Sequence, residues 1–203
     1  MSTKQNSFFS TFNQLTLILT VFSLFGLSTA QGQALSPTGA YFGVTAKSTN
    51  LMRQYNPMIG GMAGFVFNNR IGLGGFGHVM TGQIEFAGSD LEQPGATDLY
   101  LKQGYGGVFA ELFIIRNENI QLSTPIKLGY GKVGVFSQST ESVVEKSRLI
   151  VLEPEVHFDV KITKFLAIGT QVGYRLGDVD GLFNISDRNM SGFNVGLGVK
   201  VIR

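Results

Sequence analysis

Apolar and polar residues alternate over most of this chain, and the pattern is clearest between residues 148 and 176. Apolar side chains occupy nearly every second position over residues 150–160, and the same spacing resumes over residues 166–176. Successive side chains point to opposite faces only along a β-strand. The pattern therefore predicts two antiparallel strands, joined by a short break at residues 161–164, with one apolar face and one polar face.

The same alternation predicts six more strands along the chain. They cover residues 39–48, 57–67, 71–82, 99–115, 120–136 and 190–202. Each predicted strand reaches the roughly 9 to 11 residues that a tilted strand needs to cross a membrane. Ordinary globular strands are nearer 5 to 6 residues long.

The connections between these strands alternate in length. Residues 68–70, 116–119 and 161–164 form tight turns, whereas residues 49–56, 83–98, 137–147 and 177–189 form longer connections. In an up-and-down barrel, alternate connections lie on the same rim, and outer-membrane barrels have short periplasmic turns and longer extracellular loops. The sequence therefore predicts an all-β fold, an eight-stranded antiparallel up-and-down transmembrane β-barrel.

The N-terminus predicts export from the cytoplasm. Lys4 is the only charged residue before the apolar run at residues 15–27, and Ser28-Thr29-Ala30 has the small-x-small pattern of a cleavage site. The run is shorter than the roughly 20 residues of a transmembrane helix. We expect residues 1–30 to be a signal peptide, cleaved near Ala30 or Ala34, and residues 35–203 to be the barrel domain.

Composition limits the chemistry. The chain has no cysteine, which excludes a lipid-anchored lipoprotein and a thiolate metal site. Its net charge of +2 falls to +1 without Lys4, so no nucleic-acid partner is expected. The G-x-G-x-x-G motif at residues 72–77 lies within a predicted strand and no helix follows it, so it does not predict a dinucleotide site. We expect no cofactor and no metal.

If the apolar face meets lipid, the polar face lines the lumen. An eight-stranded barrel is just wide enough for its interior to be filled by side chains, and buried charges require partners. Such a network acts either as a gate or proton path or as a structural plug, and the narrow lumen favours the plug. The predicted network consists of Glu111, Lys127, Glu153, Glu155, His157 and Arg175.

Two further features follow from the predicted strands. Aromatic side chains on the outer face are expected at the two membrane interfaces, namely Phe67, Tyr130, Phe158, Tyr174 and Phe193. Pro125 and Pro154 lie near the middle of neighbouring strands and cannot donate a ladder hydrogen bond. They predict a local bulge or a water-filled gap in the ladder.

Two other functional classes remain open. A lipid deacylase or acyltransferase would need a Ser-His-acid set, whose members need to meet only in space. The sequence has no Gly-x-Ser-x-Gly elbow, and both His78 and His157 lie within predicted strands, so we expect no catalytic site. The second alternative is a soluble exported barrel that binds an apolar ligand, as lipocalins do.

Several short motifs carry a resemblance to a known family: Asn68-Asn69, Tyr105-Gly106-Gly107, Leu152-Glu153-Pro154, and residues 160–165 leading to Gly173-Tyr174-Arg175. In these motifs and their order the chain resembles the small outer-membrane barrels of the OmpA/OmpX class. It is similar, more closely, to the outer-membrane β-barrel domain proteins of the Bacteroidetes. It departs from most bacterial barrels in ending Val201-Ile202-Arg203 rather than in an aromatic residue.

The resemblance implies a place in the outer membrane of a Gram-negative cell envelope. Outer-membrane lipids, lipopolysaccharide and the barrel assembly machinery are the implied partners, and a monomer is expected. The implied role is structural, or one of surface interaction through the loops, chiefly residues 83–98.

Overall fold

The computed structural model describes residues 36–86, 99–137, 143–180 and 187–203. The predicted signal peptide and both predicted cleavage points lie outside the described residues. The described part forms nine strands and one short 3-10 helix. These are β1 (Pro37–Leu51), β2 (Gln54–Phe67), β3 (Ile71–Met80), β4 (Ile84–Phe86), β5 (Leu99–Arg116), β6 (Ile120–Ser137), β7 (Val143–Lys161), β8 (Leu166–Val179), η3 (Asp187–Met190) and β9 (Gly192–Ile202).

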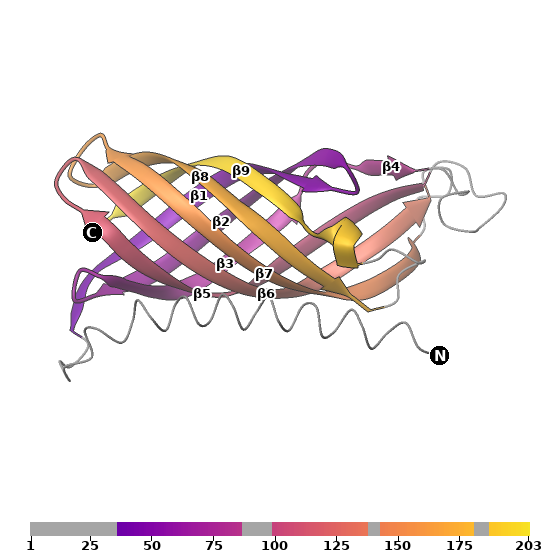
Figure 1. The fold of residues 1–203 in the computed structure, drawn as a ribbon, viewed down its shortest axis with the longest axis horizontal. Helices are drawn as coiled ribbons and strands as arrows, with labels where there is room; N and C mark the ends of the chain where they lie inside the picture. The colour runs from indigo at the N-terminus through magenta and orange to yellow at the C-terminus, as the bar shows by residue number, and fades with distance from the viewer. Residues whose placement is uncertain (1–35, 87–98, 138–142, 181–186) are drawn as a thin grey trace. The chain divides into compact units, whose positions relative to one another are not determined.

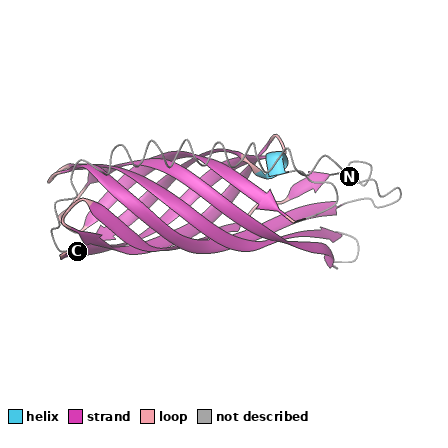
Figure 2. Ribbon diagram, turned by 60° about the horizontal axis from the view of Figure 1, so that its bottom comes forward, coloured by secondary structure: helices cyan, strands magenta, loops and turns pink. Residues whose placement is uncertain are grey.

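The strands form one antiparallel sheet that closes on itself. Their order is β3-β2-β1-β9-β8-β7-β6-β5-β4, and an additional pairing of β3 with β5 completes the ring. The first strand pairs with the last, β1 with β9. Eight long strands therefore run obliquely around a barrel, and the short β4 lies at one end of it (Figures 1 and 2). The predicted eight-stranded up-and-down barrel is confirmed.

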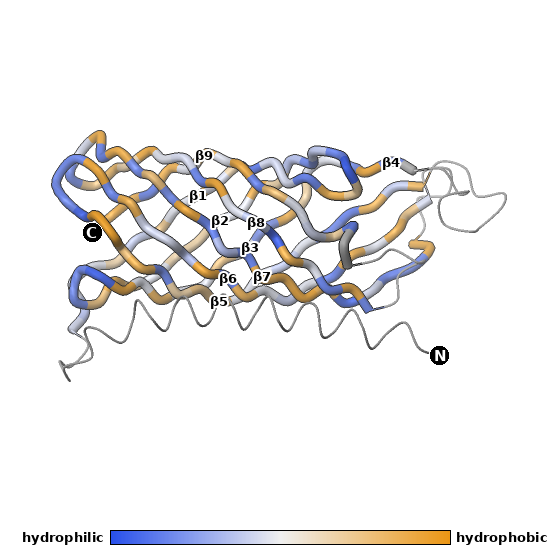
Figure 3. The backbone as a smooth tube through the Cα atoms, viewed as in Figure 1, coloured by the Kyte–Doolittle hydropathy of each residue, from blue (hydrophilic) through white to orange (hydrophobic). Residues whose placement is uncertain are grey.

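Side chains alternate between the interior and the exterior along the long strands. In β9, Val195, Leu197 and Val199 are exposed, whereas Asn194 and Lys200 on the opposite face are buried. Figure 3 shows the alternation as a change of colour along the strands. The arrangement is the reverse of a soluble barrel, because apolar side chains cover the outside and charged ones are enclosed.

Three tight turns lie at one end of the barrel, which we call the turn rim; the opposite end is the loop rim. The turns cover residues 68–70, 117–119 and 162–165. In the first of them, Asn68 and Asn69 have φ angles of 51° and 56°. Asparagine is one of the few residues that tolerates this region, which is why the sequence predicted this turn correctly.

The first connection differs from the prediction. Residues 49–56 do not form a polar loop of medium length, because β1 and β2 continue until only Met52 and Arg53 separate them. Both residues have positive φ angles, 50° and 64°, in the two-residue hairpin geometry that usually selects asparagine or glycine. Residue type therefore gave no signal for this turn. The first, third, fifth and seventh connections were all expected to be longer than the connections between them. The first connection does not follow this rule.

Strands also extend further toward the loop rim than predicted. β7 begins at Val143, inside the predicted loop at residues 137–147, and β8 continues to Val179. Part of the predicted irregular segment at residues 83–98 forms β4, which pairs with β5. Residues 87–98 lie outside the described residues. Backbone pairing continues here because hairpin hydrogen bonds need no apolar alternation.

The ladder is interrupted at both prolines, and its register does not change. Ser123 pairs with His157 and Ile126 pairs with Pro154, while the residues between them are unpaired. A second interruption lies between Leu152 and Glu155 where β7 meets β8. The ladder is therefore interrupted as predicted, neither proline forms a bulge, and the water expected in the gap stays a prediction. The bulge of this region lies between Phe113 and Ile115, on the β5 side of β6.

The loop end of the interior is apolar, which the sequence pattern did not predict. Buried aliphatic side chains from the ends of most strands gather there and pack with one another: Leu51, Ile84, Leu99, Leu101, Val133, Val135, Leu149, Val151, Val179 and Met190. Met52, in the turn between β1 and β2, packs against this cluster. Charged side chains therefore occupy only the remainder of the lumen. Within the described ranges, no helix is long and apolar enough to span a bilayer.

Candidate functional site in the barrel interior

The barrel interior encloses a charge-balanced set of side chains. Among the described residues, four cations and four carboxylates are buried, each at most 3% exposed. The cations are Lys47, Lys127, Arg175 and Lys200, and the carboxylates are Glu111, Glu153, Glu155 and Asp159. Because an isolated buried charge costs several kcal/mol, equal numbers of the two signs are what a closed lumen requires.

Glu155 is the centre of this network. Its Oε2 lies 2.5 Å from Lys127 Nζ and 2.7 Å from His157 Nε2, and its Oε1 lies 3.5 Å from Lys47 Nζ. Lys47 Nζ also lies 2.8 Å from Glu153 Oε2. The other oxygen of Glu153 accepts a hydrogen bond of 2.7 Å from the Tyr105 hydroxyl. Carboxylates of β7 are thus bridged to cations on β1 and β6.

A second group of contacts lies nearer the turn rim. Lys200 Nζ is 2.7 Å from Asp159 Oδ2 and 3.9 Å from Glu111 Oε1. Glu111 also accepts hydrogen bonds from the hydroxyls of Tyr41 and Ser123. This group brings β1, β5, β6, β7 and β9 together around two carboxylates.

His157 joins the two groups of contacts. Its Nδ1 lies 3.2 Å from Lys200 Nζ, and its Nε2 lies 2.7 Å from Glu155 Oε2. An ammonium group can only donate, so Nδ1 is the acceptor and Nε2 carries the proton that is donated to Glu155. The histidine therefore acts as a neutral link in a continuous polar chain from Tyr41 to Tyr105.

Arg175 is placed differently from the other cations. Its Nη2 donates a 2.7 Å hydrogen bond to Gln103 Oε1, and its guanidinium lies 4.8 Å from the centre of the Tyr105 ring. A cation over an aromatic face is stabilised by the ring quadrupole. Arg175 thus joins the network through Tyr105, whose hydroxyl binds Glu153.

The structure places all six residues of the predicted network inside the barrel. Five of them belong to the connected polar chain, and Arg175 is attached to it through an aromatic ring. Sequence reasoning left Lys47, Asp159 and Lys200 out of the set. The alternation along β7 and β9 places Asp159 and Lys200 on the inner face. It places Lys47 there too, because Lys47 follows Tyr41, Gly43 and Thr45 along one face of β1.

The five predicted interface aromatics lie on the outer face. Phe193 is 68% exposed, Tyr130 56%, Phe158 43% and Tyr174 38%, and Phe67 is partly exposed. The rings of Tyr174 and Phe193 meet edge to face, 5.0 Å apart. Their assignment to two membrane interfaces stays a prediction.

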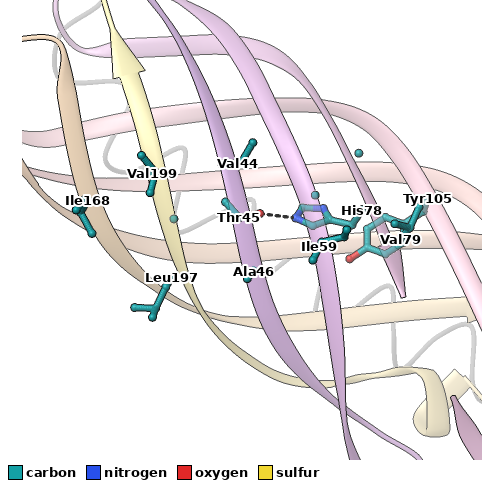
Figure 4. A pocket seen from close by; sticks show the side chains of 13 residues that line it. Val44, Thr45, Ala46, Ile59, His78, Val79, Tyr105, Ile168, Leu197 and Val199 are labelled. Atoms are coloured by element: carbon teal, nitrogen blue, oxygen red, sulfur yellow. Dashed lines mark hydrogen bonds between the residues drawn. The ribbon is translucent and has the colours of Figure 1, made fainter. Parts of the chain in front are cut away.

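The outer wall is hollowed where β1, β2, β3 and β9 lie side by side. A depression of about 810 Å³ is lined mainly by apolar side chains, including Val44, Ile59, Val79 and Leu197 (Figure 4). His78 also borders it, is 2% exposed, and has its Nε2 3.3 Å from the Thr45 hydroxyl. Thr45 supplies a hydroxyl beside the imidazole, but His78 Nδ1 has no hydrogen-bond partner among the described residues, so this pair lacks the acid that orients a catalytic histidine. Among the described side chains, no group of three His, Asp or Glu is arranged to hold a metal ion.

Comparison with solved structures identifies the fold. The attachment invasion locus protein, Ail, of Yersinia pestis is 15% identical, with a TM-score of 0.51 over 81% of this chain and 97% of that chain. Neisserial surface protein A is 12% identical, with a TM-score of 0.56 over 83% and 99%. The outer membrane protein OprG from Pseudomonas aeruginosa is 12% identical, with a TM-score of 0.50 over 83% and 97%.

No model of a known protein family matches the sequence, and no curated protein sequence matches it. The structural likeness therefore stands alone, and at these identities it concerns the fold. The chain has the fold of the eight-stranded outer-membrane β-barrels.

Proposed function

We propose that this chain is an integral outer-membrane protein, exported by its N-terminal apolar segment, that spans the membrane as a closed barrel. Its role is structural, or one of surface interaction through the loops of the loop rim. Outer-membrane lipids and lipopolysaccharide would be its surroundings, the barrel assembly machinery would insert it, and it would be a monomer. Membership of the Bacteroidetes outer-membrane β-barrel domain proteins belongs to the same proposal.

One observation carries this proposal, namely the inverted distribution of apolar and charged side chains. Large apolar side chains are exposed on all eight long strands, for example Phe42, Ile59, Leu73, Val108, Leu128, Val156, Val172 and Leu197. The buried charges lie on the inside of six of these strands, β1, β5, β6, β7, β8 and β9. Exposed apolar surface of this extent has a large free-energy cost in water and none in lipid, so the arrangement fits a bilayer.

The filled interior supports a structural role over transport. The polar chain from Tyr41 to Tyr105 is covered at the loop end by the apolar cluster that includes Leu101 and Val135. A lipocalin-like carrier would instead need an apolar cavity and a polar exterior. His78 and His157 are 2% and 1% exposed, which keeps both imidazoles from a lipid headgroup, so we propose no catalytic function.

A gel-mobility experiment on the membrane fraction tests the proposal. The protein is extracted in mild detergent and run with and without boiling, and a folded barrel migrates differently before and after. Recovery from the periplasm without detergent, or an absence of any heat-dependent shift, would contradict membrane insertion.

Two further measurements test the assigned role. In planar lipid bilayers the inserted protein should give no steady conductance, and a stable channel would contradict the plugged lumen. The His78→Ala and His157→Ala variants should leave the acylation of lipopolysaccharide unchanged. A changed acylation pattern in either variant would instead favour a lipid-modifying enzyme.

A further inference from the structure

The three hairpin turns of the turn rim carry a concentrated positive charge. Arg70 ends the first turn, Arg116 precedes the second, Lys161 precedes the third, and Lys164 lies within the third. In these three hairpin ends, all of which the structure describes, Glu118 is the single acidic residue. Within these three hairpin ends, four cations therefore face one carboxylate, and hydrophilic segments are visible at this end of the barrel (Figure 3).

Two side-chain contacts tie together the hairpin tips that carry these cations. Arg116 Nη1 donates to Asn69 Oδ1 over 3.3 Å, which links the second turn to the first. Lys161 Nζ donates to the Asn117 carbonyl oxygen over 2.6 Å, which links the third turn to the second. Each cation keeps further N–H groups for another acceptor, because an ammonium has three donors and a guanidinium five.

Each of the three tips also exposes large apolar side chains directly beside its cations. Ile71 follows Arg70 and is 38% exposed, and Ile114, two residues before Arg116, is 57% exposed. At the third tip, Ile162 and Phe165 alternate with the lysines and are 58% and 66% exposed. A water-soluble anionic partner would not require apolar side chains beside the cations. A lipid, in contrast, has acyl chains directly beside its anionic headgroup.

The loop rim has no comparable excess. Its described residues mix cations and carboxylates in nearly equal numbers. They are Arg53, Lys102, Lys132, Lys146 and Arg148 on one side, and Glu85, Glu145, Asp178 and Asp180 on the other. The charge asymmetry therefore belongs to one end of the barrel and is not a general property of its ends.

We propose that the turn rim binds the anionic headgroups of phospholipids in the leaflet that it faces. Phosphate oxygens would accept from Arg70, Arg116, Lys161 and Lys164, as charge-assisted hydrogen bonds favour. The exposed isoleucine and phenylalanine side chains would lie among the acyl chains just inside the headgroups. This inference rests on the proposed membrane insertion and adds a lipid class to it.

Spin-labelled lipids provide the test. The full chain without its signal segment is folded into phosphatidylcholine vesicles, with labelled phosphatidylglycerol or labelled phosphatidylcholine in both leaflets. Electron paramagnetic resonance then gives the ratio of the two association constants. The test variant is Arg70→Gln/Lys164→Gln, because both side chains are exposed and neither ties one hairpin tip to the next. The matched control is Arg53→Gln/Lys132→Gln at the loop rim.

The wild type and the loop-rim control should prefer phosphatidylglycerol, and added salt should weaken that preference. The turn-rim variant should lose up to about fivefold of the preference for each cation removed. Equal association of both lipids with the wild type, or an unchanged preference in the turn-rim variant, would overturn the inference. Co-sedimentation with isolated peptidoglycan without any lipid preference would also overturn it, because it would assign the rim to the cell wall.

Failure of the inference is distinguishable from failure of the proposed function. A barrel that shows the heat-dependent gel shift and stays in carbonate-washed vesicles, yet shows no lipid preference, refutes only the headgroup assignment. A protein that washes off the vesicles refutes membrane insertion itself.

Discussion

Lys127 stands directly opposite Glu153 in the pairing of β6 with β7, yet its ammonium binds Glu155, one inward position further along the strand. Glu153 is left to Lys47 on β1, a strand that does not pair with β7. Two successive inward-facing carboxylates of β7 are thus neutralised by lysines from two different strands. The charged network therefore connects strands that share no ladder.

Removal of Lys127 should destabilise the barrel. Lys127→Met leaves Glu155 with Lys47 and the neutral His157, and breaking a buried ion pair from one side costs about 3–5 kcal/mol. The free energy of unfolding, measured by urea titration in vesicles, should fall by an amount of this order. Lys132→Met on the same strand replaces an exposed lysine and should change it little. Equal losses in the two variants would contradict the importance of the pair.

The turn between β1 and β2 can be improved. Arg53 has a φ of 64°, and a side chain in the left-handed region costs roughly 1–2 kcal/mol. Arg53→Gly should therefore raise the unfolding free energy by about 1 kcal/mol, measured in the same titration. Asn69→Gly, with a φ of 56°, should give no comparable gain, because asparagine already tolerates the conformation and its Oδ1 accepts the hydrogen bond from Arg116.

The alternation, the strand lengths, the alternating connection lengths and the export signal together predicted the barrel. A strand with lipid on one side and a narrow lumen on the other has only two environments, so the alternation also assigns the inner and outer faces. The same rule assigned Lys127 and Glu155 to the interior. It could not predict that Lys127 would bind Glu155 in preference to Glu153, because that depends on side-chain reach across the lumen. It also could not predict the apolar loop end, where Val151 and Leu149 continue the inner face that Glu153 and Glu155 begin.

β5 and β6 approach each other closely at Gly107, so an added side chain should be more destabilising there than at a glycine with open space around it. A Cβ atom at Gly107 would lie 2.0 Å from the Leu128 carbonyl oxygen and 2.8 Å from Gly129 Cα. Gly107→Ala should therefore force the backbone apart and lower the unfolding free energy by about 1–3 kcal/mol. At Gly77 the nearest atom, the Tyr105 carbonyl oxygen, is 3.9 Å away, so Gly77→Ala should be tolerated. Thermal or urea unfolding of both variants distinguishes the positions.

The ladder interruption between β7 and β8 predicts a change in hydrogen exchange. Pro154→Val supplies the missing N–H group and has the β-branched shape that suits a strand. The new amide at position 154 should exchange as slowly as those of paired residues such as Val156 and Phe158. Rapid exchange at position 154 would mean that the interruption has a cause other than the proline.

The pairing of the first and last strands also determines the charge balance of the barrel interior. Lys47 and Lys200 lie on β1 and β9, so these two strands contribute two of the four buried cations. Without them, Lys127 and Arg175 would face four carboxylates, a net interior charge of −2. The pairing of the first and last strands therefore also neutralises the lumen. A barrel whose first and last strands are unpaired would retain uncompensated charge in its interior. This sequence therefore disfavours a half-assembled barrel as a stable state.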